Sequence, residues 1–218
     1  MASGMEIVYQ KGYAINKRVS AVINSANGFL LLGTSGAGAI REKSQHLTRK
    51  EKEEYSKLLS SLPKRISNDY RRVYAEHKWT PTYAQLGGLR LLVDRKGCEV
   101  KRGDAVLQVD WSKDDSRPII HAVGMSYKLR IHDSSRLKAT PTTIRNSLTK
   151  ALKIADFLEA KSIALPVMCA RPTYGVGPEA SLRIIRSTLH SFKAKHIKRA
   201  VVCFDNSITR SYLDNIRR

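Results

Sequence analysis

A run of small residues could bind a phosphate group through the protein backbone. Gly33 to Gly38 contains only glycine, threonine, serine and alanine. It follows a buried strand pattern that ends in Asn24 to Asn27, and it precedes a helix that is expected to start near Ala39. Small side chains let backbone N–H groups approach a ligand closely, and a helix N-terminus adds a positive dipole end. The run therefore predicts a site for an anion such as a diphosphate. The alternative is a tight connection that needs glycine for its φ angles.

A second small-residue run, Ala170 to Gly177, also follows a strand pattern and leads into a helix that begins at Pro178. In an open α/β sheet, the loops that follow the strands line the ligand site. Two such loops favour a phosphate clamp more than either loop does alone. Neither run matches the GxxxxGK[ST] or GxGxxG pattern, so the sequence disfavours a P-loop ATPase and a dinucleotide dehydrogenase.

The side chains near these runs do not form a recognisable catalytic or metal-binding group. Ser35 and Cys169 lie close to the runs, but neither has an identified base, so neither is predicted to be a nucleophile. His121 lies inside a strand pattern, where a hydrogen-bonded core histidine is the favoured interpretation. The pair His132-Asp133 is too common in sequences to define a dyad. The three cysteines, Cys98, Cys169 and Cys203, do not have the spacing of metal ligands. They are expected to be buried as small apolar side chains. Neither a metal nor a cofactor is predicted.

Short β-branched runs alternate with helical patterns, which predicts an α/β fold with a largely parallel or mixed central sheet. The strand patterns cover Glu6–Tyr9, Ser20–Asn24, Asp104–Asp110, Pro118–Val123, Ser162–Met168 and Ala200–Phe204. One helix is predicted from an N-cap at Thr140 as far as Ala160, with Leu158 on its buried face. Another is predicted to begin at Pro178. The length of 218 residues supports a single domain over residues 1–218.

The stretch from Arg41 to Lys78 is rich in Lys, Arg and Glu, with apolar residues at helical spacing. It predicts two amphipathic helices broken near Pro63. These helices should cover one edge of the core, because so few apolar residues cannot fill a core alone. The stretch from Trp79 to Gly88 is expected to be a loop, with Pro81 and the pair Gly87-Gly88 as breakers.

The composition is strongly basic, with 39 Lys and Arg against 19 Asp and Glu and a formal net charge of +20 at pH 7. Such a surface favours polyanions. RNA, DNA and poly-ADP-ribose are candidate partners, contacted through their phosphates without sequence readout. A highly basic proteome is the competing explanation. Neither a transmembrane span nor a signal peptide is evident, so a soluble, cytoplasmic protein without a membrane partner is expected.

Six segments occur in an order that is typical of one family. They are Val22 to Ile40 with its strand, NxAN motif and glycine run, RGDAV at 102–106, PIIHAVG at 118–124, SIALPVM at 162–168, Tyr174-Gly175 and VVCFD at 201–205. Together they resemble the macro domains, which bind ADP-ribose and related metabolites. The resemblance implies a three-layer α/β/α sandwich with a mixed central sheet and an ADP-ribose site at the strand ends. The stretch from about 42 to 97 is longer than the usual connection of the family and is predicted to be a helical insertion.

The resemblance also implies roles for individual residues. Asn27 would hydrogen-bond the distal ribose, and Asn24 would support the loop. The diphosphate would lie against the backbone of Gly33, Thr34, Ser35, Gly36 and Ala37, and would be closed from the other side by Thr173, Tyr174, Gly175 and Val176. The adenine would pack near Phe204, with Asn206 close by.

Three positions differ from the family pattern. Tyr13, followed by Ile15, stands where family members usually have an Asp that contacts the adenine amino group, so these two residues mark the predicted adenine side. Ala37 replaces the acidic residue of the hydrolytic members, and Pro172 removes an N–H donor from the second run. The sequence therefore predicts a non-catalytic reader of ADP-ribose or a related metabolite. The alternatives are a nucleic-acid or poly-ADP-ribose binding protein with an altered pocket, and an ADP-ribosyl hydrolase or ADP-ribose-phosphate phosphatase.

Overall fold

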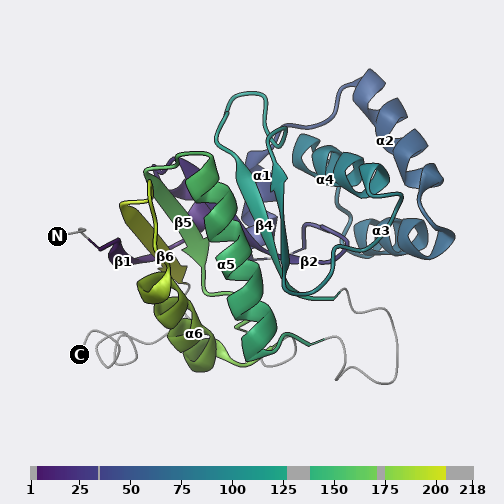
Figure 1. Cartoon of the computed structure of the whole chain (residues 1–218). Coiled ribbons are helices and arrows are strands. Elements are labelled where there is room, and N and C mark those ends of the chain that lie inside the picture. Colours follow the sequence, from purple (N-terminus) through teal and green to yellow (C-terminus); the bar gives the residue numbers. More distant parts are fainter. Residues whose placement is uncertain (1–3, 34, 127–137, 171–174, 205–218) are drawn as a thin grey trace.

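The structure is a computed structural model that describes residues 4–33, 35–126, 138–170 and 175–204. At its centre is a six-stranded sheet in the order β1-β6-β5-β2-β4-β3 (Figure 1). The first five of these strands are parallel to one another, and β3 runs antiparallel to β4. All six predicted strands are present, at β1 Glu6–Lys11, β2 Ala21–Asn27, β3 Asp104–Gln108, β4 Ile119–Met125, β5 Ser162–Pro166 and β6 Arg199–Phe204. The prediction of a mixed α/β sheet is confirmed.

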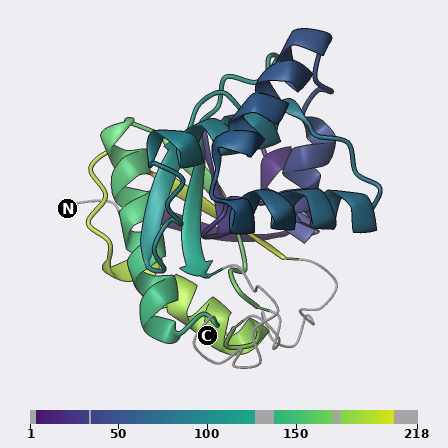
Figure 2. The same ribbon diagram turned by 90° about the vertical axis from the view of Figure 1, so that its right-hand side faces the viewer.

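Helices cover both faces of the sheet, which makes a three-layer α/β/α sandwich (Figures 1 and 2). One layer consists of α5 (Pro141–Phe157) and α6 (Pro178–Ser191), which pack against each other. The other layer contains the 3-10 helix η1 (Ala14–Asn16), α1 (Ser35–Lys43), α2 (Arg49–Ser61), α3 (Lys64–Glu76) and α4 (Tyr83–Asp94). Within the described ranges, no helix is long and apolar enough to cross a membrane.

The parallel strands give the sheet two different edges. The edge where β1, β2, β4, β5 and β6 end lies at the bottom of Figure 1 and is called the carboxyl edge. The edge where the same strands begin lies at the top and is called the amino edge. Because β1 and β2 belong to the same parallel set, residues 12–20 return the chain from the carboxyl edge to the amino edge, and η1 lies in that return. Helices α5 and α6 likewise run from the carboxyl edge to the amino edge.

The sequence explains where α5 starts and why it stops early. Thr140 caps the helix through a capping box, and Pro141 occupies the first turn, where its missing N–H is not needed. The apolar residues of the buried face are Ile144, Leu148, Ala151, Leu152 and Ala155. The helix ends at Phe157, earlier than the predicted residue 160, because Glu159 takes a positive φ of 55°. The predicted burial of Leu158 is therefore wrong, and its side chain is 39% exposed.

Helices α2, α3 and α4, together called the helical segment, form a second apolar cluster against β4. Pro63 separates α2 from α3, as predicted. The predicted loop over 79–88 is wrong, because α4 begins at Tyr83 and contains both glycines. A Cβ atom at Gly87 would lie 2.2 Å from Gln108 Nε2, so the glycine lets α4 pack closely against the end of β3. That this stretch is an insertion into a single domain stays a prediction.

The expected burial of the cysteines is confirmed for two of the three. Cys169 and Cys203 are buried, whereas Cys98 is exposed. Cys98 directly follows a turn at Gly97, which has a φ of +69°.

Candidate functional site

The first small-residue run lies at the carboxyl edge, between the end of β2 and the start of α1. Helix α1 begins at Ser35, earlier than the predicted residue 39, so the second half of the run forms the first helical turn. None of Gly33, Gly36 and Gly38 has a positive φ, which excludes the explanation from backbone angles. A Cβ at Gly33 would meet no described atom within 4 Å, and one at Gly36 would meet only Pro166 Cβ, at 4.0 Å. Within the described part of the chain, nothing fills the space in front of these two glycines.

The start of α1 supplies directed donors to this space. The N–H groups of a first helical turn have no partner inside the helix, and the helix dipole makes this end positive. Ser35 is exposed with a φ of 61°, and Gly36 and Ala37 are half-buried. Position 38 requires a glycine for a different reason, since a Cβ there would lie 3.0 Å from the carbonyl oxygen of Gly33. A dianionic diphosphate is the kind of group that this geometry can bind. Thr34 lies outside the described residues.

Asn27, at the end of β2, holds the turn that follows the strand. Its Nδ2 donates to the carbonyl of Leu31 at 2.9 Å. Its Oδ1 accepts from the N–H groups of Phe29 at 3.0 Å and of Leu31 at 3.3 Å. An amide nitrogen carries two hydrogens, so one remains for another acceptor. Removing this side chain would disturb the turn as well as any ligand contact.

The helical segment holds the backbone between Asn27 and the glycine run from behind. Gln85 of α4 accepts from the N–H of Leu32 at 2.9 Å and donates to the carbonyl of Leu30 at 3.4 Å. Tyr70 of α3 donates to the carbonyl of Phe29 at 2.5 Å. These groups are buried, so each bond also avoids the cost of an unsatisfied polar atom. The sequence analysis missed this contribution, because its partners are far apart along the chain.

Arg41 of α1 is a second residue that the sequence analysis missed. Its Nη1 donates to the carbonyls of Leu32, at 3.0 Å, and of Gly33, at 2.6 Å. Its guanidinium carbon lies 3.6 Å from the centroid of the Trp79 ring, which joins α1 to the chain between α3 and α4. Burial is the main cause of a lowered pKa for this arginine. Arg41 therefore fixes the backbone where the glycine run begins, at the carbonyls of Leu32 and Gly33.

The second small-residue run is packed in its described part. A Cβ at Gly175 would lie 2.2 Å from the carbonyl oxygen of Cys169, and Gly177 has a φ of +83° where it caps α6. These two glycines are therefore required by the fold itself. Val176 is half-buried and packs against the cluster under α5 and α6. The other members of this predicted wall, Arg171, Pro172, Thr173 and Tyr174, lie outside the described residues.

The predicted adenine side is brought together only in part. The N–H of Gly12 donates to the carbonyl of Phe204 at 2.9 Å, so Tyr13 follows directly beside the end of β6. Tyr13 is 42% exposed and Phe204 is half-buried. The side chain of Ile15 is 1% exposed and belongs to the core. Asn206 and the pair His132-Asp133 lie outside the described residues.

A buried polar relay crosses the sheet beneath the site. Asn24 Nδ2 lies 3.1 Å from His121 Nδ1, and His121 Nε2 lies 2.7 Å from Gln108 Oε1. A single neutral tautomer satisfies both bonds, with Asn24 donating to Nδ1 and Nε2–H donating to Gln108. Burial lowers the pKa of His121 to about 4, which keeps the ring neutral. The interpretation of His121 as a hydrogen-bonded core histidine is confirmed, and the Asn24 side chain is occupied in this relay.

The Cys169 thiol is not activated. Cys169 Sγ lies 3.9 Å from Ser25 Oγ, and burial raises the pKa of the thiol to about 11. A thiol with this pKa is protonated near neutral pH. Among the described residues, no group of three His, Cys, Asp or Glu side chains could hold a metal ion.

Comparisons with known proteins agree with this architecture. No family profile matches the chain. The uncharacterized protein SSO2899 of Saccharolobus solfataricus is 24% identical over 200 residues, which cover 92% of this chain and 85% of the relative. The macro domain of ganglioside induced differentiation associated protein 2 is similar in structure, with a TM-score of 0.60 and 16% identity over 97% of this chain and 82% of that one. A mutant of the Oceanobacillus iheyensis macrodomain, solved with ADPR, has a TM-score of 0.55 and 19% identity over 97% of this chain and 89% of that one.

A mixed six-stranded sheet between two helical layers defines an α/β/α sandwich. The helix that follows the second strand begins at an open glycine run on the carboxyl edge. The chain has the macro domain fold, as the sequence resemblance implies.

Proposed function

We propose that the carboxyl edge binds ADP-ribose or a related ADP-ribosyl metabolite, and that the protein acts as a reader without strong catalysis. The observation that carries the proposal is the open space in front of Gly33 and Gly36 at the start of α1. Backbone donors there match the diphosphate, which carries the negative charge of the ligand. The similar macrodomain that was solved with ADPR supports the same class of ligand.

The other parts of the ligand are assigned along the same edge. The strand order puts β5 between β6 and β2, so Phe204 and Asn27 end strands that are separated by two strand spacings, roughly 10 Å. We assign the adenine to the side of Tyr13 and Phe204, and the distal ribose to Asn27 with its remaining N–H. The diphosphate then lies between them, beside the start of α1. Thr34, Thr173, Tyr174, Gly175, Val176 and Asn206 complete the set that the resemblance implies.

Three features support a reader over a hydrolase. Ala37 carries no ionisable group at the position where the resemblance implies an acid in hydrolytic members. The Cys169 thiol has a pKa raised to about 11, and His121 is neutral and fully engaged. Enzymatic release of ADP-ribose from a modified protein, or of phosphate from an ADP-ribose phosphate, would contradict this part of the proposal.

Calorimetric titration of ADP-ribose into Gly33→Val tests the site directly. The added side chain enters the space in front of the run and displaces charge-assisted backbone hydrogen bonds worth about 1.5–3 kcal/mol each, so the affinity should fall about tenfold or more. Gly33 has no positive φ and its Cβ would meet no described atom within 4 Å, so the thermal unfolding midpoint should not fall. Gly4→Val is the matched control, because a Cβ at Gly4 also meets open space, away from the site. Unchanged affinity of Gly33→Val would overturn the assignment.

A further inference from the structure

The amino edge of the sheet carries a row of cations. A lysine or arginine begins, or lies within three residues before, each of four adjacent parallel strands: Lys198 and Arg199 at β6, Lys161 at β5, Arg18 before β2, and Arg117 before β4. Backbone hydrogen bonds link these strand starts, from Lys198 N to Lys161 O at 2.9 Å and from Ser20 N to Ser162 O at 3.0 Å. Strands lie about 4.8 Å apart, so the row extends over roughly 15 Å.

Part of this row surrounds a surface hollow of about 620 Å³. The hollow is lined by Asn16, Lys17, Arg18, Val19, Ser20, Lys43, Arg117 and Ser162. Asp115 pairs with Arg117, and Glu6 pairs with Arg199. Lys43 interacts electrostatically with Asp115, and its Nζ donates to the carbonyl of Ile15 at 3.3 Å. Among the described residues, no carboxylate forms an ion pair with Arg18 or Lys161. Like charges repel one another, so a bound anion would relieve the repulsion that remains around Arg18 and Lys161.

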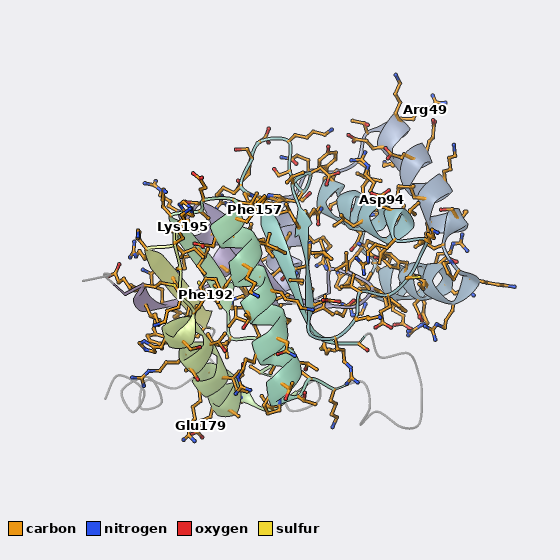
Figure 3. All side chains as sticks on the ribbon, in the orientation of Figure 1. Arg49, Asp94, Phe157, Glu179, Phe192 and Lys195 are labelled. Atoms are coloured by element: carbon orange, nitrogen blue, oxygen red, sulfur yellow. The ribbon has the colours of Figure 1, made fainter. Side chains whose placement is uncertain are left out.

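An exposed aromatic ring stands at the same edge. Phe157, the last residue of α5, is 86% exposed, more than any other large apolar side chain in the described part of the chain. The preceding Asp156 accepts from the N–H groups of Lys195, His196 and Ile197, which holds the loop that carries Lys195 against the end of α5. Figure 3 shows Phe157 and Lys195 at this end of the molecule, with Glu179 at the opposite end. A phenyl ring that is exposed to this extent contributes little to packing, and it has the chemistry of a surface on which a base stacks.

We propose that the amino edge binds single-stranded nucleic acid, with phosphates along the row of cations and an unpaired base on Phe157. The row is long enough for about four nucleotides, the smaller end of known single-strand sites. An unpaired base is required, because the bases of a duplex are already stacked on each other and offer no free face. Contacts to phosphates and to a base face carry no sequence readout. This site is separate from the carboxyl edge, so the two ligands do not compete.

Fluorescence anisotropy with a labelled oligouridylate and a labelled oligodeoxythymidylate tests the location. The variant Arg18→Glu/Lys161→Glu/Lys195→Glu should bind about tenfold more weakly or worse, and its slope of log K against log salt should be shallower by about 2. The control Lys50→Glu/Lys57→Glu/Lys64→Glu makes the same change in net charge with exposed lysines of the helical segment. It should stay within about threefold of the parent protein, since screened charges at a distance contribute little. Equal losses in the two variants would overturn the proposal.

Phe157→Ala and Phe157→Trp test the stacking. The alanine variant should lose about fivefold or more in affinity, and the tryptophan variant should retain it, because stacking needs a flat ring. Binding that is unaffected by Phe157→Ala, or tighter binding of duplex or poly-ADP-ribose than of the single strand, would overturn the single-strand assignment. The triple glutamate variant and Phe157→Ala should both keep the ADP-ribose affinity of the parent protein. Failure of this inference is therefore distinguishable from failure of the proposed function.

Discussion

The two edges of the sheet both suit phosphate groups, but by different means. At the carboxyl edge the donors are backbone N–H groups at the start of α1, whose positions the fold determines. At the amino edge the charges lie on long side chains such as Arg18, Lys161 and Lys198. A backbone donor points in one direction and loses no side-chain entropy on binding, whereas a lysine ammonium is a mobile point charge. One sheet can therefore offer a selective site and an unselective one at opposite ends of the same strands.

The largest effect should come from removing the hydrogen bonds that Gln85 of α4 makes to the backbone of Leu30 and Leu32. Gln85→Leu leaves the N–H of Leu32 and the carbonyl of Leu30 buried without partners, so we expect a loss of about 2–4 kcal/mol in the free energy of unfolding. Urea unfolding measures this loss. The control is Gln45→Leu, since Gln45 bonds exposed groups that water can satisfy, and it should cost about 1 kcal/mol or less. Equal costs would show that the helical segment does not specifically hold this loop.

Lowering the pH should reduce the free energy of unfolding through His121, which is buried in the sheet between the two edges. The unfolded chain has a histidine pKa of about 6.5, and folded His121 has a pKa of about 4. Between these values the unfolded state binds more protons, so stability falls as the pH is lowered from 6.5 towards 4, by up to about 3 kcal/mol. Urea unfolding across this range measures the loss. Titration of folded His121 near its ordinary pKa, followed by NMR, would contradict the buried relay.

Salt should separate the two edges in a single experiment. About five cation contacts to a single strand predict a fall of roughly 100-fold in oligonucleotide affinity between about 50 and 200 mM salt. ADP-ribose, bound by directed backbone donors, should change by less than about threefold over the same range. Parallel titrations of both ligands measure the difference. If ADP-ribose were as sensitive to salt as the oligonucleotide, the distinction between directed and mobile donors would be lost.

The sequence predicts those parts of this arrangement that depend on neighbouring residues. β-Branched runs predict all six strands, and Thr140 and Pro141 predict the start of α5. That the glycine run binds phosphate stays a prediction. The hydrogen bonds from Gln85 and Tyr70 to the loop after β2 could not be predicted, because each residue contacts a loop more than 40 residues away. Helix α4 was missed for a related reason. Glycine is a helix breaker in isolation, but at Gly87 it provides the space that Gln108 of β3 requires.

The smallest predicted effect tests whether the cation–π contact between Trp79 and Arg41 influences ligand binding at the carboxyl edge. Trp79→Leu removes a cation–π contact worth about 1 kcal/mol and keeps an apolar side chain of moderate size. Because Arg41 donates to the carbonyls of Leu32 and Gly33, a looser guanidinium should let the glycine run move. We therefore expect about threefold weaker ADP-ribose binding in calorimetry and unchanged oligonucleotide binding. Trp79→Phe, which keeps an aromatic face, should restore most of the ADP-ribose affinity.

Equal weakening of both ligands by Trp79→Leu would mean that the substitution acts through the whole fold. Unchanged ADP-ribose binding would mean that Arg41 holds the run through its hydrogen bonds alone.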